Sequence, residues 1–222
     1  MNVLFCAYRS WALDSLDLII SDHSQLATNC NYLVAKNQEE FNSYQNLNLN
    51  LDLAFFVGWS WKIPQRFLEK NLSICFHPSP LPKYRGGSPI QHQIINGEKK
   101  SCGTFFKMTR DLDAGPIVWQ KEYSLEGELG EVFSRLTPLV AEGVKFILEN
   151  FESLIYVAQI ESDRTFFSRR TPEMSEITIE DFKNMTALEL HNKIRALQDP
   201  YPNAFIVTKD GSKLFILKSR IK

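Results

Sequence analysis

Short apolar runs, each about the length of one β-strand, alternate with amphipathic stretches through much of the chain. The runs at residues 2–7, 53–57 and 72–76 predict strands, and residues 12–20 and 129–151 carry apolar side chains at helical spacing. This alternation is typical of βαβ units, in which parallel strands form a sheet that helices cover. The other predicted elements are a short helix at residues 63–69 and strands at residues 31–34, 102–108 and 117–123. The sequence therefore predicts an α/β fold with a mostly parallel sheet.

The pattern changes after about residue 165. The spacing of Thr186 and Glu189 predicts a capping box that begins a helix, which should end before Pro200. Two apolar runs at residues 205–208 and 213–217 flank an Asp-Gly pair, which predicts a hairpin. We therefore predict two parts, a main domain over residues 1–165 and a small C-terminal subdomain of helix and hairpin over residues 166–222.

The composition is that of an ordinary globular protein, with 44% hydrophobic and 23% charged residues. A formal net charge of −1 provides no global attraction to nucleic acid or anionic lipid, so neither is an expected partner. The start of the chain has no leader pattern, and no apolar run approaches the ~20 residues that a membrane span needs. The four cysteines are scattered without a CxxC pair, so we expect reduced thiols and no metal site. These features predict a soluble, cytoplasmic protein.

Residues 75–91, CFHPSPLPKYRGGSPIQ, join the end of a buried strand to a proline-rich loop and a helix. Ser88 and Gln91 have the spacing of a capping box at the start of that helix. Ligands of α/β sheets bind at the carboxyl ends of the strands, and the predicted strand ends near His77. An imidazole there is suited to proton transfer. A packing or capping role for His77 is the alternative, which the residues by themselves leave equally open.

A second polar segment, Thr109–Pro116, lies between two predicted strands and ends in a Gly-Pro turn. An aspartate here could face the same crevice as His77, and an imidazole with a carboxylate forms an acid/base pair. The alternative is a turn in which the carboxylates only accept bonds from nearby amides. Asp113 lies closer to the Gly-Pro turn, and Asp111 is predicted to be more solvated, but periodicity leaves the choice open.

These segments, in this order, resemble the folate-dependent formyltransferase family. The matching residues are His77-Pro-Ser-Pro-Leu-Pro-Lys-Tyr-Arg-Gly86, Pro89, Gly97, Leu112-Asp113-Ala-Gly-Pro116, Arg195-Ala-Leu197 and Pro200-Tyr-Pro202. The resemblance implies a Rossmann-like catalytic domain over residues 1–165 and 10-formyltetrahydrofolate as co-substrate, with no metal. It also implies that His77 stabilises the oxyanion and that Asp113 assists removal of a proton from the attacking amine.

Cys75 departs from the family pattern, because the family usually has an asparagine two residues before the histidine. A thiol is a weaker hydrogen-bond donor than an amide, and loss of one oxyanion donor typically costs ~100- to 1,000-fold in turnover. Cys75 therefore indicates a rearranged oxyanion hole, a slower enzyme, or a relative that binds folate without turnover. A nucleophilic role for its thiol, with His77 as base, is a further hypothesis.

The resemblance also assigns binding residues. It places folate against Gly58, Trp59 and Ser60 and against Arg110, Asp111 and Leu112, while core or lid packing is the alternative for the aromatic residues. The predicted acceptor-binding residues are Ser79, Tyr84, Arg85, Arg9 and Trp11. A structural role, in which the guanidinium of Arg85 ties loop carbonyls together, is the alternative for that residue, and a solvated loop is the alternative for Arg9 and Trp11.

The tail after residue 165 has 57 residues, with 10 Lys and Arg against 7 Asp and Glu. It is short for the basic barrel of relatives that formylate initiator tRNA. The resemblance therefore favours the group that formylates nucleotide-linked amino sugars for surface polysaccharides. A methionyl-tRNA or other small-amine formyltransferase, a binder without turnover and a formate-releasing hydrolase are the alternatives. Apolar residues near the end could form a homodimer interface or could equally fold back on the main domain: Phe205, Phe215, Ile216 and Leu217.

Overall fold

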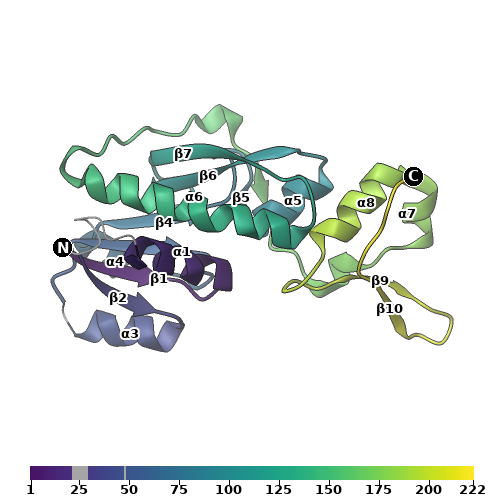
Figure 1. Ribbon diagram of the computed structural model, residues 1–222, viewed down its shortest axis with the longest axis horizontal. Helices are drawn as coiled ribbons and strands as arrows, with labels where there is room; N and C mark the ends of the chain where they lie inside the picture. Colours follow the sequence, from purple (N-terminus) through teal and green to yellow (C-terminus); the bar gives the residue numbers. More distant parts are fainter. Residues whose placement is uncertain (22–29, 48) are drawn as a thin grey trace.

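A six-stranded sheet forms the centre of the molecule, for which the computed structural model describes residues 1–21, 30–47 and 49–222. The strand order is β2-β1-β3-β4-β6-β7 (Figure 1). The first four strands in this order pair in parallel, and β6 and β7 add antiparallel at one edge. The bounds are β1 Asn2–Cys6, β2 Asn31–Ala35, β3 Leu53–Val57, β4 Ser73–His77, β6 Lys100–Lys107 and β7 Ile117–Ser124. The predicted α/β fold with a mostly parallel sheet is confirmed.

Helices cover both faces of this sheet, because its central strands are apolar on both sides. All five residues of β3 are buried. Its consecutive residues Phe55 and Phe56 point to opposite faces and belong to two different core clusters. The first cluster is shared with helices α1 and α6 and the second with α3 and α4. The helix bounds are α1 Ser10–Ser21, α3 Gln38–Asn46, α4 Gln65–Lys70, α5 Pro89–Ile95 and α6 Leu129–Glu149.

Two details of the helices differ from the sequence prediction. Ser88 adopts a left-handed conformation (φ 52°) and its hydroxyl accepts the N–H of Arg170, so the predicted capping box of α5 is wrong. The cause is tertiary, since Gly87 lies so close to Arg169 that a Cβ would meet its Cα at 2.4 Å. Helix α3 was not predicted, although Asn37 caps it by accepting the N–H of Glu40.

The C-terminal part has its own small core, made by residues such as Ile177, Ile194 and Ala204. The predicted capping box at Thr186 and the predicted antiparallel hairpin are confirmed. Phe205 is 4% exposed, so it offers little surface for the expected dimer interface. The elements are β5 Arg85–Gly86, β8 Phe166–Phe167, α7 Ile179–Asn184, α8 Ala187–Ala196, β9 Ala204–Val207 and β10 Lys213–Ile216, with 3-10 turns η1 Phe151–Ser153, η2 Glu161–Asp163 and η3 Pro172–Ser175.

Several contacts join this part to the preceding part of the chain. Helix α8 lies beside α5 (Figure 1), and the buried Arg195 donates to the carbonyls of Leu125 and Gly127 just before α6. The short strand β8 pairs in parallel with β5, in the loop that follows His77. Residues far apart in sequence are thereby brought to the carboxyl end of β4. Among the helices of the described ranges, none has the length and apolar character to cross a membrane.

Candidate active site

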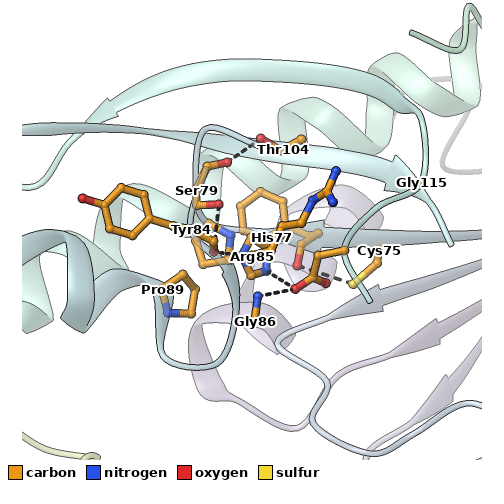
Figure 2. Close-up of polar contacts among 12 residues, drawn as sticks. Cys75, His77, Ser79, Tyr84, Arg85, Gly86, Pro89, Thr104 and Gly115 are labelled. Atoms are coloured by element: carbon orange, nitrogen blue, oxygen red, sulfur yellow. Dashed lines mark hydrogen bonds and ion pairs between the residues drawn. The ribbon is translucent and has the colours of Figure 1, made fainter. Parts of the chain in front are cut away.

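His77 is the last residue of β4 and is held by the loop that follows it. Its Nε2 lies 2.8 Å from the carbonyl oxygen of Tyr84, and only 6% of the residue is exposed. A carbonyl can only accept a hydrogen bond, so Nε2 carries the proton in this contact. Nδ1 faces the carboxylate of Asp113, with 3.7 Å between Nδ1 and Oδ2 (Figure 2). The loop thus fixes which ring nitrogen is directed at the acid.

Asp113 is held in an uncommon conformation beside this ring. Its φ is 53°, a left-handed value that aspartate tolerates better than most residues, and it is 8% exposed. Its Oδ2 accepts the N–H of Gly86 at 2.8 Å, and Asp111 is exposed. A Cβ on Gly115 would meet the carbonyl oxygen of Lys107 at 1.7 Å, so the turn requires glycine there. Of the two candidate acids, the structure brings Asp113 to His77.

Two pockets meet at Asp113. The pocket that contains His77, here called the His77 pocket, has a volume of about 410 Å³. A second one, here called the Trp61 pocket, has a volume of about 630 Å³. The residues common to both walls are Trp59, Ser60, Cys75, Leu112 and Asp113. A group bound in one pocket can therefore meet a group bound in the other next to Asp113 and Cys75.

The thiol of Cys75 stays protonated near neutral pH. Burial raises its pKa well above the usual value, and the nearby Asp113 carboxylate raises it further. Its Sγ lies 3.7 Å from the carbonyl oxygen of Phe76, a weak contact typical of a thiol donor (Figure 2). Because the nucleophilic form of cysteine is the thiolate, this environment disfavours a nucleophilic role.

The predicted folate residues divide between the two pockets. Trp59 and Ser60 line both, Gly58 lines the His77 pocket, and Arg110, Asp111 and Leu112 line the Trp61 pocket, Leu112 reaching the first as well. Trp59 forms aromatic contacts with Phe41, Phe56 and Trp61. Its ring thus belongs to the packed wall of the Trp61 pocket.

The predicted acceptor residues also separate into two groups. Arg9 and Trp11 line the His77 pocket. Ser79 is fully buried and bonds the carbonyl of Lys83, the Tyr84 hydroxyl donates to Glu98, and Arg85 binds Gln159 and Glu161. For these three residues the geometry favours structural roles within the loop.

Sequence reasoning missed several residues of the His77 pocket, above all Arg169 and Tyr201. Arg169 donates to the hydroxyl of Ser60 at 2.9 Å, and the guanidinium of Arg9 lies 5.1 Å from the centre of the Tyr201 ring. Tyr201 belongs to the Pro-Tyr-Pro segment, which matches the family motif but was not assigned to the site from the sequence. Arg169 had no such signal, because only the pairing of β8 with β5 brings it near the site.

The pocket is therefore a mixture of cationic and aromatic side chains around one acid. Its wall carries two arginines, Arg9 and Arg169, and one acid, Asp113. Within the described ranges, no cluster of three His, Cys, Asp or Glu side chains could hold a metal ion. The arrangement is suited to an anionic, ring-bearing ligand that presents a group to the His77–Asp113 pair.

Comparison with known families identifies the class of protein. The family model described as formyl transferase matches residues 20–131, just over half of the chain, and the formyl transferase C-terminal domain model matches residues 171–222. The chain therefore belongs to the formyl transferase family. The resemblance drawn from residues 77–116 and 195–202 is confirmed.

Similar proteins carry more than one name. A methionyl-tRNA formyltransferase of Lactobacillus acidophilus is 35% identical over 178 residues, covering 76% of this chain and 54% of that protein. The chain spans about half the length of the curated relatives it matches. The solved methionyl-tRNA formyltransferase from Clostridium thermocellum is 26% identical, with 97% of each chain covered and a TM-score of 0.80. A 4-N formyltransferase from Francisella tularensis, 19% identical with 100% and 98% covered, has a TM-score of 0.80, which shows the shared fold.

Proposed function

We propose that this chain transfers a formyl group from 10-formyltetrahydrofolate to the amine of a nucleotide-linked amino sugar. The observation that carries the proposal is the junction of the two pockets, where Cys75 and Asp113 belong to both walls. In this proposal the folate binds in the Trp61 pocket and the acceptor in the His77 pocket. The two reacting groups would then meet beside His77 and Asp113.

The Trp61 pocket fits a flat ring system. Its wall combines aromatic and aliphatic side chains with the polar segment that leads to Asp113. Apolar walls with a few placed polar groups are typical of sites for such ligands. The lining residues that would contact folate are Phe56, Trp59, Trp61, Ile63, Leu68, Phe106, Met108, Arg110, Asp111 and Leu112.

The chemistry follows from the orientation of the two side chains. A bound 10-formyltetrahydrofolate supplies the formyl carbon, to which the acceptor nitrogen forms a bond as the bond to the folate nitrogen breaks. A neutral imidazole has one N–H, which His77 uses for the Tyr84 carbonyl, so Nδ1 would donate to the developing oxyanion in the imidazolium form, beside the Asp113 carboxylate. Asp113 accepts the proton that the amine loses and can return it to the folate nitrogen.

Arg9, Arg169 and Tyr201 support the choice of acceptor. Two guanidinium groups can bind phosphate oxygens, and an aromatic ring can stack on a base or cover a sugar. The net charge of −1 and the mildly basic tail give little support for a large polyanion. We therefore propose a nucleotide-linked amino sugar as the acceptor, ahead of other amines. The formylated sugar would be used in surface polysaccharides.

Methionyl-tRNA is the second candidate acceptor. It is favoured by the curated relatives and by the Clostridium thermocellum structure, which this chain covers over 97% of its length. That match removes tail length as an argument against tRNA. A homodimer through the C-terminal hairpin stays a prediction, and the exposed side chains of Leu214, Phe215 and Leu217 support it.

The test is a transfer assay with the purified chain. We would incubate it with 10-formyltetrahydrofolate and either a panel of nucleotide-linked amino sugars or methionyl-tRNA, and follow the products by mass spectrometry. A formylated sugar that forms with the wild type and is lost with His77→Ala supports the proposal. Formylation of methionyl-tRNA alone would replace the acceptor. Folate binding without any transfer would favour a binder in which Cys75 prevents turnover, and formate release without an acceptor would favour a hydrolase.

A further inference from the structure

The side-chain amide of Gln159 is bonded at both ends. Its Nε2 donates to the carbonyl oxygen of Asp113 at 2.9 Å and to that of Gly115 at 2.7 Å. Its Oε1 accepts from Nε and Nη2 of Arg85, at 3.1 and 2.7 Å. Four hydrogen bonds thus converge on one uncharged group, which is bonded to the main chain of the turn that carries Asp113.

The chemistry of its neighbours fixes the orientation of this amide. A guanidinium has only donors, so the oxygen of Gln159 must face Arg85. The carbonyls of Asp113 and Gly115 have only acceptors, so the NH₂ group must face the turn. A flipped amide would set donors against donors and acceptors against acceptors. Gln159 is therefore matched to both partners in a single orientation.

Arg85 is in turn held by an acid at the surface. The arginine is 5% exposed, and it donates to both carboxylate oxygens of Glu161, at 3.2 Å from Nη1 and 2.6 Å from Nη2. The side chain of Glu161 is 55% exposed. A continuous set of hydrogen bonds thus runs from a surface carboxylate through Arg85 and Gln159 to the main chain of Asp113.

Tyr84 and Gly86, the neighbours of Arg85 in the loop, also bind the side chains of His77 and Asp113. The Tyr84 carbonyl accepts from His77, and the Gly86 N–H donates to Asp113 Oδ2. Gly86 thus binds the side chain of Asp113. Gln159 binds the backbone carbonyl of the same residue, whose φ is 53°.

We propose that Gln159 is a positioning residue, which holds the Asp113 turn in its left-handed conformation and thereby sets the distance between Asp113 and His77. Arg85 supports it by fixing its amide. The expected effect on turnover rests on the proposed function. The positioning of the Asp113 turn does not depend on that function. A displaced carboxylate would slow proton transfer without changing either binding pocket.

Three variants test the kinetic part. Gln159→Leu removes both sets of bonds, whereas Gln159→Glu keeps acceptors for Arg85 but places a carboxylate against the two carbonyls. Arg164→Leu is the matched control, because Arg164 donates to Oε2 of Glu161, the oxygen that also accepts from Nη1 of Arg85, and Gln159 keeps all four of its bonds in this variant. We expect kcat to fall about 10- to 100-fold in both Gln159 variants, with KM for folate and acceptor within about twofold. The control should keep the wild-type kcat. Wild-type kcat in Gln159→Leu, or an equal loss in the control, would overturn the proposal.

Amide hydrogen exchange tests the positioning without any activity. The Gly86 N–H donates to Asp113, while the N–H groups of Arg85 and Gly87 donate to Thr165 and Phe167 in the neighbouring segment. By NMR, Gln159→Leu should speed exchange at Gly86 about tenfold or more and leave Arg85 and Gly87 unchanged. Unchanged Gly86 exchange, or equal acceleration at all three, would refute the positioning role. If the wild type transfers no formyl group while Gly86 alone is accelerated, the positioning holds and the proposed function fails.

Discussion

The Nε2 atom of His77 lies 2.8 Å from the carbonyl oxygen of Tyr84, across a loop stiffened by three prolines. Because the carbonyl occupies this nitrogen, the other nitrogen, Nδ1, is the one that faces Asp113. The two nitrogens therefore have separable duties, with Nε2 holding the loop and Nδ1 available for chemistry. Amide side chains can imitate each nitrogen in turn, which allows the duties to be tested one at a time.

The first prediction concerns His77→Gln and His77→Asn. The amide nitrogen of glutamine reaches the position of Nε2, and that of asparagine the position of Nδ1. We expect His77→Gln to keep the thermal stability and to lose ~100- to 1,000-fold in kcat, because the donor toward the reacting oxygen is gone. We expect His77→Asn to keep more kcat but to lose about 1–3 kcal/mol of unfolding free energy, because the buried Tyr84 carbonyl loses its donor. Thermal unfolding with steady-state kinetics checks both, and the reverse order would assign chemistry to Nε2.

The second prediction concerns Asp113→Asn. Asparagine also tolerates a φ of 53° and keeps an oxygen for the Gly86 N–H, so the unfolding free energy should change by less than about 1 kcal/mol. It cannot accept the amine proton, so kcat should fall ~100- to 10,000-fold. Asp17→Asn is the control, since Asp17 is exposed on α1 and lines neither pocket, and it should keep wild-type turnover. Equal losses in the two variants would show that Asp113 has no special role in proton removal.

The fold was predicted where burial alone decides the structure. Strand β3 is buried throughout, so its sequence, LAFFV, is apolar at every position and can be recognised without neighbours. The start of α5 was not predictable in the same way. Ser88 has the residue type and spacing of a cap, but contact between Gly87 and Arg169 sets its backbone and directs its hydroxyl to Arg170.

The site was predictable only in its local parts. His77 ends strand β4 and Asp113 lies in the loop between β6 and β7, both within recognisable motifs, and the structure brings them together. Gln159 and Arg169 come from segments that reach the site through tertiary structure, and no local pattern marks them, whereas Tyr201 lies in the Pro-Tyr-Pro motif, which had no assigned position. An exposed ligand-binding arginine and a buried structural one look the same in sequence, which is why Arg85 was predicted to bind the acceptor.

The third prediction concerns the reactivity of Cys75. Alkylating reagents attack the thiolate, and burial together with the Asp113 carboxylate raises the thiol pKa, so the thiolate fraction is small at pH 7.5 and grows as the pH rises. We expect iodoacetamide to modify Cys75 at least about tenfold more slowly than a cysteine of the unfolded chain. Asp113→Asn removes the like charge, so the pKa of Cys75 should fall and its alkylation should accelerate. Peptide mapping by mass spectrometry checks this.

Cys102 is the internal control for that experiment. Burial and Glu122 raise the pKa of its thiol, so Asp113→Asn should leave its alkylation rate unchanged. A Cys75 that reacts faster than an unfolded-chain cysteine at pH 7.5 would contradict the protonated state and would restore the nucleophilic hypothesis for this residue.

The fourth prediction compares two glycine substitutions. In Gly115→Ala the new Cβ would meet the carbonyl oxygen of Lys107 at 1.7 Å, so the Asp113 turn must shift. We expect a loss of about 1–3 kcal/mol in unfolding free energy and about 100-fold in kcat. Gly130→Ala is the matched change, because it lies in α6 with open space around the new Cβ, and it should be neutral or stabilising by about 0.5–1 kcal/mol. Chemical unfolding measures both, and equal stability of the two variants would show that the turn accommodates a side chain.

The fifth prediction separates the two pockets. Arg169 lines only the His77 pocket and Trp61 only the Trp61 pocket, while Ser60 lies between them. Arg169→Met removes a charged donor that can bind an acceptor phosphate, so KM for the nucleotide sugar should rise about 10- to 100-fold with KM for folate unchanged. Trp61→Ala removes aromatic surface from the other pocket, so KM for folate should rise about tenfold with KM for the acceptor unchanged. Steady-state kinetics with each substrate varied in turn gives all four constants. If Arg169→Met raised the folate KM instead, the two pockets would have to exchange ligands, and the junction at Cys75 and Asp113 would still be where the two substrates meet.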